Sequence, residues 1–204
     1  EDTYTPATPL GFELSSDKTS YTVISIGKYT APDVIIPATY NGKPVTAIAD
    51  RAFSGITRIT SVFIPNSVTT IGRGILEGCT SLTSITIPFT GGSKSATGIA
   101  SHFGYIFDYD RTETRRGSNN GYRYDEYVQN KIVYKKIYTY YNIPATLKSV
   151  TISGNYVHIG EQAFRGCFLT SLTVSGRIVS VGEMAFSECG LNAVYITDLA
   201  AWCN

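Results

Sequence analysis

A phrase of 22 to 23 residues recurs along the chain and limits the folds that the chain can adopt. The stretches VTAIADRAFSGITRITSVFIP and VTTIGRGILEGCTSLTSITIP start at Val45 and Val68 and match at eight apolar, Gly or Pro positions. The phrases LKSVTI, LTSLTV and LNAVYI begin 22 residues apart, at Leu147, Leu169 and Leu191. One such unit cannot bury its own apolar face, whereas stacked units can. The repeat therefore predicts a solenoid.

Each unit predicts the same short elements. The phrase LTSITI alternates apolar and polar residues, as a short strand does, and Pro88 ends it because proline cannot donate to a ladder. The phrase VTTIG predicts a second extended piece, and the Ala-Phe pairs predict a single helical turn with phenylalanine inward. We expect Phe53, Phe164 and Phe186 to be buried. The expected parallel rungs are Leu82/Ile85/Ile87, Leu147/Val150/Ile152, Leu169/Leu172/Val174 and Leu191/Val194/Ile196.

The combined pattern resembles a known repeat family. The phrase L-x-x-(I/V)-x-(I/V)-P, followed by (V/I)-x-x-I-G and A-F-x-x-C, is similar to the BspA-like leucine-rich repeats of bacterial surface proteins. The resemblance covers roughly residues 33–90 and 144–199. It implies a leucine-rich-repeat solenoid that is β-rich, with parallel strands and short helical turns. It also implies a secreted or cell-surface protein with an adhesion or interaction role.

The remaining segments predict a cap and an insertion within one structural domain. Residues 1–44 are expected to form a lead-in and a β-hairpin cap, with a tight turn at Asn41-Gly42. Repeats occupy residues 45–88 and 147–204, and we expect them to be truncated at the C-terminus. The intervening residues 89–146 contain about 42 residues more than one period requires.

The insertion is rich in tyrosine and basic. Nine of the 15 Tyr lie within residues 101–141, and residues 89–146 hold eight Lys/Arg against five Asp/Glu. Its first part, SHFGYIFDYD, alternates aromatic residues from Phe103 to Tyr109 and predicts a strand. Because the insertion leaves and returns between neighbouring rungs, we expect the solenoid to fold when residues 93–141 are replaced by a short link.

Two interpretations of these aromatic residues remain open. In one, Phe103, Tyr105 and Phe107 pack the insertion onto the solenoid as a satellite core. In the other, exposed Tyr and Arg side chains form a recognition surface, since both residue types are enriched in binding hot spots. The candidate ligand-binding residues are Tyr109, Arg115, Arg116, Tyr122, Arg123, Tyr124 and Tyr127.

Other function classes find little support in the sequence. The net charge is +1, and acidic residues interleave with the Tyr and Arg of the insertion, so we expect no nucleic-acid partner. No run reaches the roughly 18 apolar residues of a membrane helix, so we expect no membrane insertion. We expect no metal or cofactor, because zinc-ligand spacings and a phosphate-binding loop are absent. His102 and His158 are interpreted as structural or surface residues, and Cys167 and Cys189 as buried thiols.

The sequence therefore favours a non-catalytic, monomeric interaction module. Its partner would be a host protein or a glycan, and its location secreted or on the cell surface. Two alternatives stay open: a structural spacer that projects another domain, and an unrecognised hydrolase.

Overall fold

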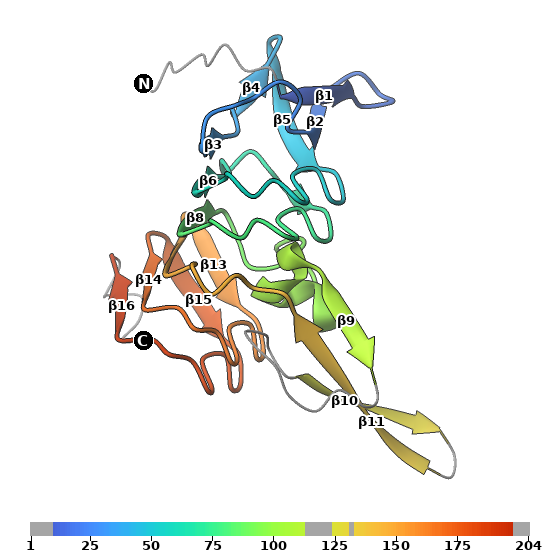
Figure 1. Ribbon diagram of the computed structural model, residues 1–204, viewed down its shortest axis with the longest axis vertical. Helices are drawn as coiled ribbons and strands as arrows, with labels where there is room; N and C mark the ends of the chain where they lie inside the picture. The colour runs from blue at the N-terminus through green and yellow to red at the C-terminus, as the bar shows by residue number, and fades with distance from the viewer. Residues whose placement is uncertain (1–9, 113–123, 131–132, 198–204) are drawn as a thin grey trace.

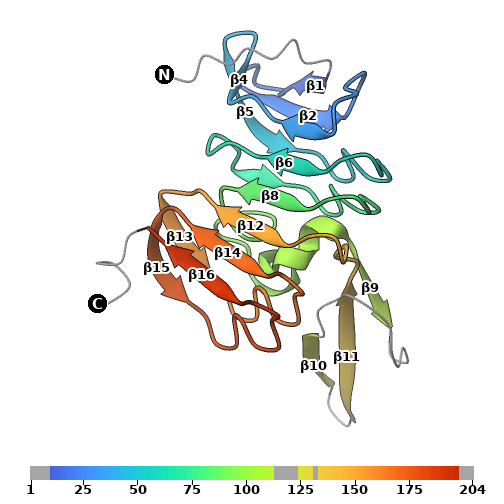
Figure 2. The same cartoon turned by 60° about the vertical axis from the view of Figure 1, so that its left-hand side comes forward.

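The computed structural model describes residues 10–112, 124–130 and 133–197, with only the strand backbone given between residues 109 and 140. Its main feature is a ladder of short parallel strands, one from each turn of the solenoid (Figure 2). This confirms the predicted leucine-rich-repeat solenoid. In spatial order the strands are β16 (Ala193–Ile196), β14 (Ser171–Val174), β12 (Ser149–Ile152), β8 (Ser84–Ile87), β6 (Ser61–Phe63) and β3 (Asp33–Ile35).

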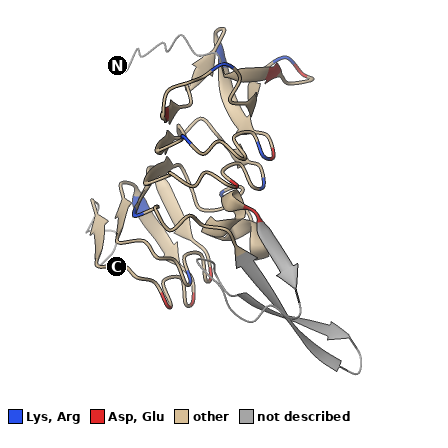
Figure 3. Ribbon diagram, in the orientation of Figure 1, with Lys and Arg blue, Asp and Glu red and all other residues tan. Residues whose placement is uncertain are grey.

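Register places like residues beside like along the ladder. Ile85 lies beside Val62 on one side and Val150 on the other. These side chains point into the solenoid and are buried, whereas Ser84 and Thr86 of the same strand are half-buried on its outer face. From β6 to β16 the strands carry no charged residue, as Figure 3 shows. The period of two in each phrase thus becomes an apolar inner face and a hydroxyl-rich outer face.

A second, interrupted wall lies on the other side of the core. β5 (Lys43–Ile48) pairs in parallel with β7 (Thr70–Ile71), as the expected second extended piece of each unit requires. Farther along the solenoid, β13 (Tyr156–Ile159) pairs in parallel with β15 (Arg177–Val181) as a separate two-stranded sheet (Figure 1). The break between these two sheets coincides with the insertion.

The N-terminal segment forms a β structure at one end of the ladder. β1 (Gly11–Leu14) and β2 (Tyr21–Ser25) pair antiparallel, and β2 then pairs in parallel with β5. β4 (Thr39–Tyr40) joins β5 through a two-residue turn. Asn41 and Gly42 have φ values of 47° and 74°, the left-handed conformation expected of this turn.

The Ala-Phe turns differ from the single helical turn that the sequence suggests. Successive three-residue hydrogen bonds, such as Ser54 N–H to the Arg51 carbonyl at 3.0 Å, make a chain of tight turns. A continuous helix cannot form there because Arg51 and Gly55 both have positive φ. Phe53 and Phe164 are nonetheless fully buried, as expected.

The last rung is more open than the sequence suggests. β16 pairs with β14 in the expected register, but Phe186 is only half-buried and Val194 is 43% exposed. Within the described residues nothing stacks on the outer side of β16, so its inner face is covered from one side only. The expectation that Phe186 is buried is therefore wrong.

Candidate ligand-binding surface

The insertion begins and ends between adjacent strands of the ladder. Ser84 of β8 pairs directly with Ser149 of β12, although 64 residues separate them. Two 3₁₀ segments come first, η1 (Gly98–Ser101) and η2 (Phe103–Phe107), followed by a three-stranded antiparallel sheet. The β-sheet consists of β9 (Tyr109–Thr112), β10 (Tyr124–Asn130) and β11 (Val133–Tyr141), and Figure 1 shows it projecting away from the solenoid. We refer to β9–β11 as the projecting sheet.

The aromatic run expected to form a strand is the 3₁₀ segment η2 instead. Phe103 and Phe107 are fully buried. The Phe103 ring stacks on Phe164 with 5.1 Å between centroids. Packing decides the local conformation here, because η2 occupies the place of an Ala-Phe turn in the stack. This outcome confirms the first interpretation for Phe103 and Phe107, whereas Tyr105 is half-buried against the core.

Backbone hydrogen bonds fix η2 into the column of turns. The amides of Gly74 and Leu76 donate to the carbonyls of Tyr105 and Ile106, at 3.0 and 2.9 Å. On its other side, Phe103 N–H donates to the Ala163 carbonyl at 2.9 Å. The insertion therefore supplies part of the solenoid itself. Replacing residues 93–141 would remove core residues, so the expectation that such a variant folds is unsound.

A buried carboxylate joins the projecting sheet to the solenoid. Asp108, at the start of β9, is 4% exposed and has a positive φ of 65°. Its side chain accepts hydrogen bonds from Arg51 and Arg73, the latter at 2.5 Å. Arg51 also lies 3.4 Å from Glu77. Charge-assisted bonds of this kind hold the first residue of the sheet in one position.

The other end of the projecting sheet is anchored by an aromatic ring. Tyr141, the last residue of β11, is 1% exposed, and its hydroxyl lies 2.7 Å from Nδ1 of His102. Gly104 allows this packing, since a Cβ there would lie 2.1 Å from Cγ of Tyr141. Tyr109 pairs with Tyr141 across the two strands, so both ends of the sheet meet at the anchor. The sequence placed Tyr141 among the insertion's tyrosines without separating it from the others.

The candidate ligand-binding residues belong to this projecting sheet and the loop before β10. The structure gives the backbone positions of Tyr109, Tyr124 and Tyr127, and register pairs Tyr124 with Thr139 and Tyr127 with Lys136. Because residues alternate between faces, positions 109 and 124 share one face and position 127 belongs to the other. The backbone thus separates residues that the sequence grouped together. Outside the described residues lie Arg115, Arg116, Tyr122 and Arg123.

Sequence reasoning missed the role of Asp108. The residue was counted only as one of several acidic residues that balance the charge of the insertion. A signal was present, because Arg51 and Arg73 lie one period apart and therefore stack on one edge of adjacent turns. Two stacked cations need a carboxylate, and Asp108 provides it.

A comparison with protein-family models identifies the repeat. The model of the BspA type leucine rich repeat region matches six copies, over residues 13–97 and 135–201. The chain belongs to this family. Repeats of the BspA type are typically non-catalytic, and leucine-rich-repeat modules generally bind proteins. No curated protein sequence matches the chain significantly.

Solved structures of bacterial leucine-rich-repeat proteins are similar to this BspA-type chain. The T. pallidum leucine-rich-repeat protein is 20% identical, with a TM-score of 0.43 over 93% of this chain and 70% of its own. A leucine-rich-repeat protein from Bacteroides ovatus is 22% identical, with a TM-score of 0.42 over 92% and 39%. A leucine-rich cell surface protein from Faecalibacterium prausnitzii is 22% identical, with a TM-score of 0.40 over 95% and 54%.

The reactive side chains of the described BspA-type repeats are engaged in packing. Burial lowers the pKa of His102 to about 4 and raises that of Cys79 to about 11, which keeps both groups neutral. Cys189 also has a raised pKa from burial, and its thiol donates to the Phe164 carbonyl at 2.6 Å. Cys79, Cys167 and Cys189 are thiols, as expected, although Cys189 is half-buried.

Two wider searches concern the described residues alone. No three His, Cys, Asp or Glu side chains among them lie close enough together to hold a metal ion. None of their helices has the length and apolar character to cross a membrane.

Proposed function

We propose that the chain is a non-catalytic binding module of a secreted or cell-surface protein, and that the projecting sheet is its recognition element. The ligand is a host protein or a glycan. The observation that carries the proposal is the double anchor at Asp108 and Tyr141. A passive linker between two neighbouring rungs needs neither a buried ion pair nor a buried aromatic ring. Such anchors hold a sheet in a fixed orientation, which lowers the entropy lost on binding.

Composition supports the same role. The insertion combines tyrosines with arginines, which give a large contact area and directed hydrogen bonds. The outer face of the ladder instead presents Ser and Thr from strands without charged residues. The strongest side chains for recognition therefore belong to the insertion rather than to the repeats.

Excision of the projecting sheet tests the proposal. Asp110 and Tyr140 are paired, so an Asn-Gly link between them closes the shortened β9–β11 hairpin and retains Asp108 and Tyr141. The parent chain and this variant would be screened on an array of extracellular-matrix proteins and glycans. We expect the parent to bind one array member, and the excised variant to melt as the parent does but to lose that binding.

Point variants locate the contact within the sheet. Replacing Tyr109 and Tyr124 together by Ala should weaken binding by about tenfold or more, as loss of hot-spot side chains does. The matched control is Tyr195→Ala, a tyrosine that is 59% exposed on β16. Binding that survives excision would place the contact on the repeats. A parent that binds no array member would favour the spacer alternative.

A further inference from the structure

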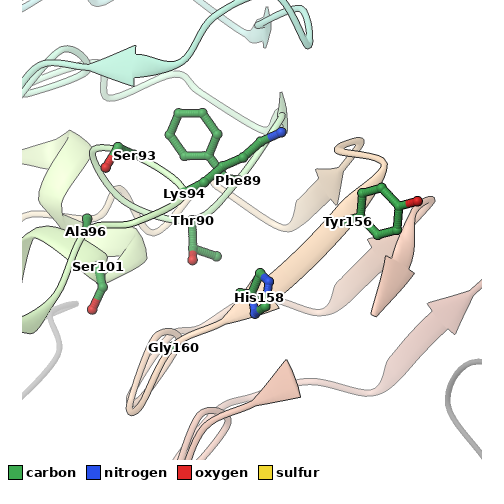
Figure 4. A pocket seen from close by; sticks show the side chains of 9 residues that line it. All are labelled: Phe89, Thr90, Ser93, Lys94, Ala96, Ser101, Tyr156, His158 and Gly160. Carbon is green, nitrogen blue, oxygen red and sulfur yellow. The ribbon is translucent and has the colours of Figure 1, made fainter. Parts of the chain in front are cut away.

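A small hollow opens on the solenoid away from the projecting sheet. It has a volume of about 50 Å³ and lies between residues 89–101 and strand β13 (Figure 4). Phe89, Thr90, Ser93 and Lys94 approach from one side, and Tyr156 and His158 from the other.

The hollow results from the break in the second wall of the solenoid. Gly92 carbonyl accepts a hydrogen bond from Ile71 N–H at 2.7 Å, so the start of the insertion follows β7. Among the described strands, β13 pairs only with β15, which leaves its other edge facing residues 89–96. The two sides touch at both ends: a Cβ at Gly154 would lie 2.1 Å from the Pro88 carbonyl oxygen, and one at Gly160 would lie 3.3 Å from Ser101 Oγ. Between these contacts the walls separate.

Polar groups without partners line the hollow. Thr90 is only 4% exposed, yet its hydroxyl makes no hydrogen bond with any described residue. Within the same part of the chain, the side chains of Ser93, Lys94 and Tyr156 also lack partners. His158 uses Nδ1 on Ser180 Oγ at 2.9 Å, which leaves Nε2 available. Buried polar groups normally have partners, so this cluster suits a polar ligand.

Charge and shape narrow the ligand class. Lys94 is the one cation among the lining residues, and no carboxylate lies among them. Tyr156 is 63% exposed and offers a ring face, whose negative charge attracts polarised C–H groups. A volume of about 50 Å³ accepts a few waters or one carboxylate, but not a whole sugar ring.

We propose that this hollow binds an acidic sugar unit of a glycan. The carboxylate enters the hollow beside Lys94 and accepts hydrogen bonds from Thr90 and Ser93. The sugar ring stays outside and packs its C–H face on Tyr156, while His158 contacts a ring hydroxyl. This second site deepens the glycan part of the proposed function and does not depend on the projecting sheet.

NMR titration of the full chain with methyl glucuronide and methyl galacturonide tests the site. Methyl glucoside, methyl galactoside and acetate are the comparison ligands, which separate the sugar from the charge. We expect a uronide to bind at least about tenfold more tightly than its neutral glycoside and than acetate, because both the ion pair and the ring contact contribute. Equal binding of a neutral glycoside, equal binding of acetate, or no uronide binding would overturn the proposal.

Variants assign the contacts. Lys94→Gln and Tyr156→Ala should each weaken uronide binding by about tenfold, the effect of removing one charged or aromatic partner. Lys148→Gln and Tyr195→Ala, both exposed elsewhere, should leave it unchanged. Unaltered binding in both Lys94→Gln and Tyr156→Ala would also overturn the site. The excised variant without the projecting sheet should retain uronide binding, so failure of either site can be recognised separately.

Discussion

At the level of single residues, the repeat depends on two left-handed backbone positions in each turn. They lie four residues apart, on either side of the Ala-Phe pair, and recur in four turns. Glycine occupies half of these positions, and larger residues occupy the others at a local energetic cost. The pairs are Arg51/Gly55, Gly74/Gly78, Gln162/Gly166 and Met184/Glu188.

Met184→Gly should therefore stabilise the protein. Met184 has φ of 53°, and its side chain is 53% exposed, so little buried area is lost. Relief of the left-handed conformation is worth roughly 1–2 kcal/mol, against about 0.5–1 kcal/mol for the added freedom of glycine in the unfolded chain. We expect a net gain of about 0.5 kcal/mol in the free energy of unfolding, measured by urea denaturation.

Ser187→Gly is the matched control for this prediction. Ser187 lies in the same turn, three residues on, and has no positive φ. The change should destabilise the protein by about 0.5–1 kcal/mol, because only the entropic penalty remains. A similar effect of both substitutions would show that the left-handed conformation carries no cost at position 184.

Among the elements, the projecting sheet is the one whose position depends on a few contacts. Its β9 strand begins at Asp108, whose carboxylate bridges Arg51 and Arg73 from two successive turns of the solenoid. The arginines are 57% and 40% exposed, so solvent screens part of the interaction. The carboxylate itself is almost fully buried, and this makes it the sensitive member of the cluster.

Asp108→Asn should loosen the projecting sheet without unfolding the ladder. Removing the carboxylate leaves two neighbouring guanidinium groups without their counter-charge, and we expect a loss of about 1–2 kcal/mol after screening. Hydrogen exchange should become faster for amides of β9 and β11, while β8 and β12 keep their protection.

Glu77→Gln provides the comparison. It weakens only the 3.4 Å pair with Arg51, and should change exchange in the sheet little. If Asp108→Asn leaves exchange in β9 and β11 unchanged, the anchor lies elsewhere, with Tyr141 as the next candidate.

The whole molecule shares one hydrophobic core that passes through the insertion. Phe103 stacks on Phe164, and Phe164 stacks on Phe186 at 5.8 Å between centroids. Solenoid stability is a sum of repeat terms and nearest-neighbour interfaces. η2 forms the interface between the turns before and after the insertion, so the coupling of the two halves runs through it.

Phe103→Ala should consequently weaken the link between the halves. Truncating this buried ring should cost about 3–5 kcal/mol. We also expect the thermal transition to broaden or split in calorimetry, because the N-terminal and C-terminal repeats then unfold with less coupling. Phe186→Ala, at the half-buried end of the stack, should cost clearly less and leave a single transition. Equal effects of the two variants would contradict a linking role for η2.

The periodic part of this fold could be predicted from sequence because each rung repeats the same local rule. Alternation at Ile85 and Ile87, the turn at Asn41-Gly42 and the inward Phe53 all follow from spacing and residue type. The run from Phe103 to Tyr109 could not be assigned in this way. Its alternation fits a strand equally well, and only contacts with turns far away in sequence make it a 3₁₀ segment.

The candidate sites depend on still longer relations. Register within the projecting sheet, which separates Tyr124 from Tyr127, follows from strand pairing rather than from composition. The hollow beside Lys94 and Tyr156 exists because two walls diverge, and no local pattern encodes a divergence. Asp108 could have been found only by treating Arg51 and Arg73 as stacked neighbours.

The pairing of Tyr109 with Tyr141 has a consequence for how such a protein can change over generations. Everything beyond these two residues leaves the body of the molecule through one narrow doorway, while the core beneath it stays closed. Substitutions and length changes in residues 110–140 can then be selected for what they bind, and those in the rungs for whether they stack. A lineage could exchange the outer segment for another antiparallel hairpin at this doorway and keep every rung. Recognition and stability would thus evolve on separate parts of the same chain.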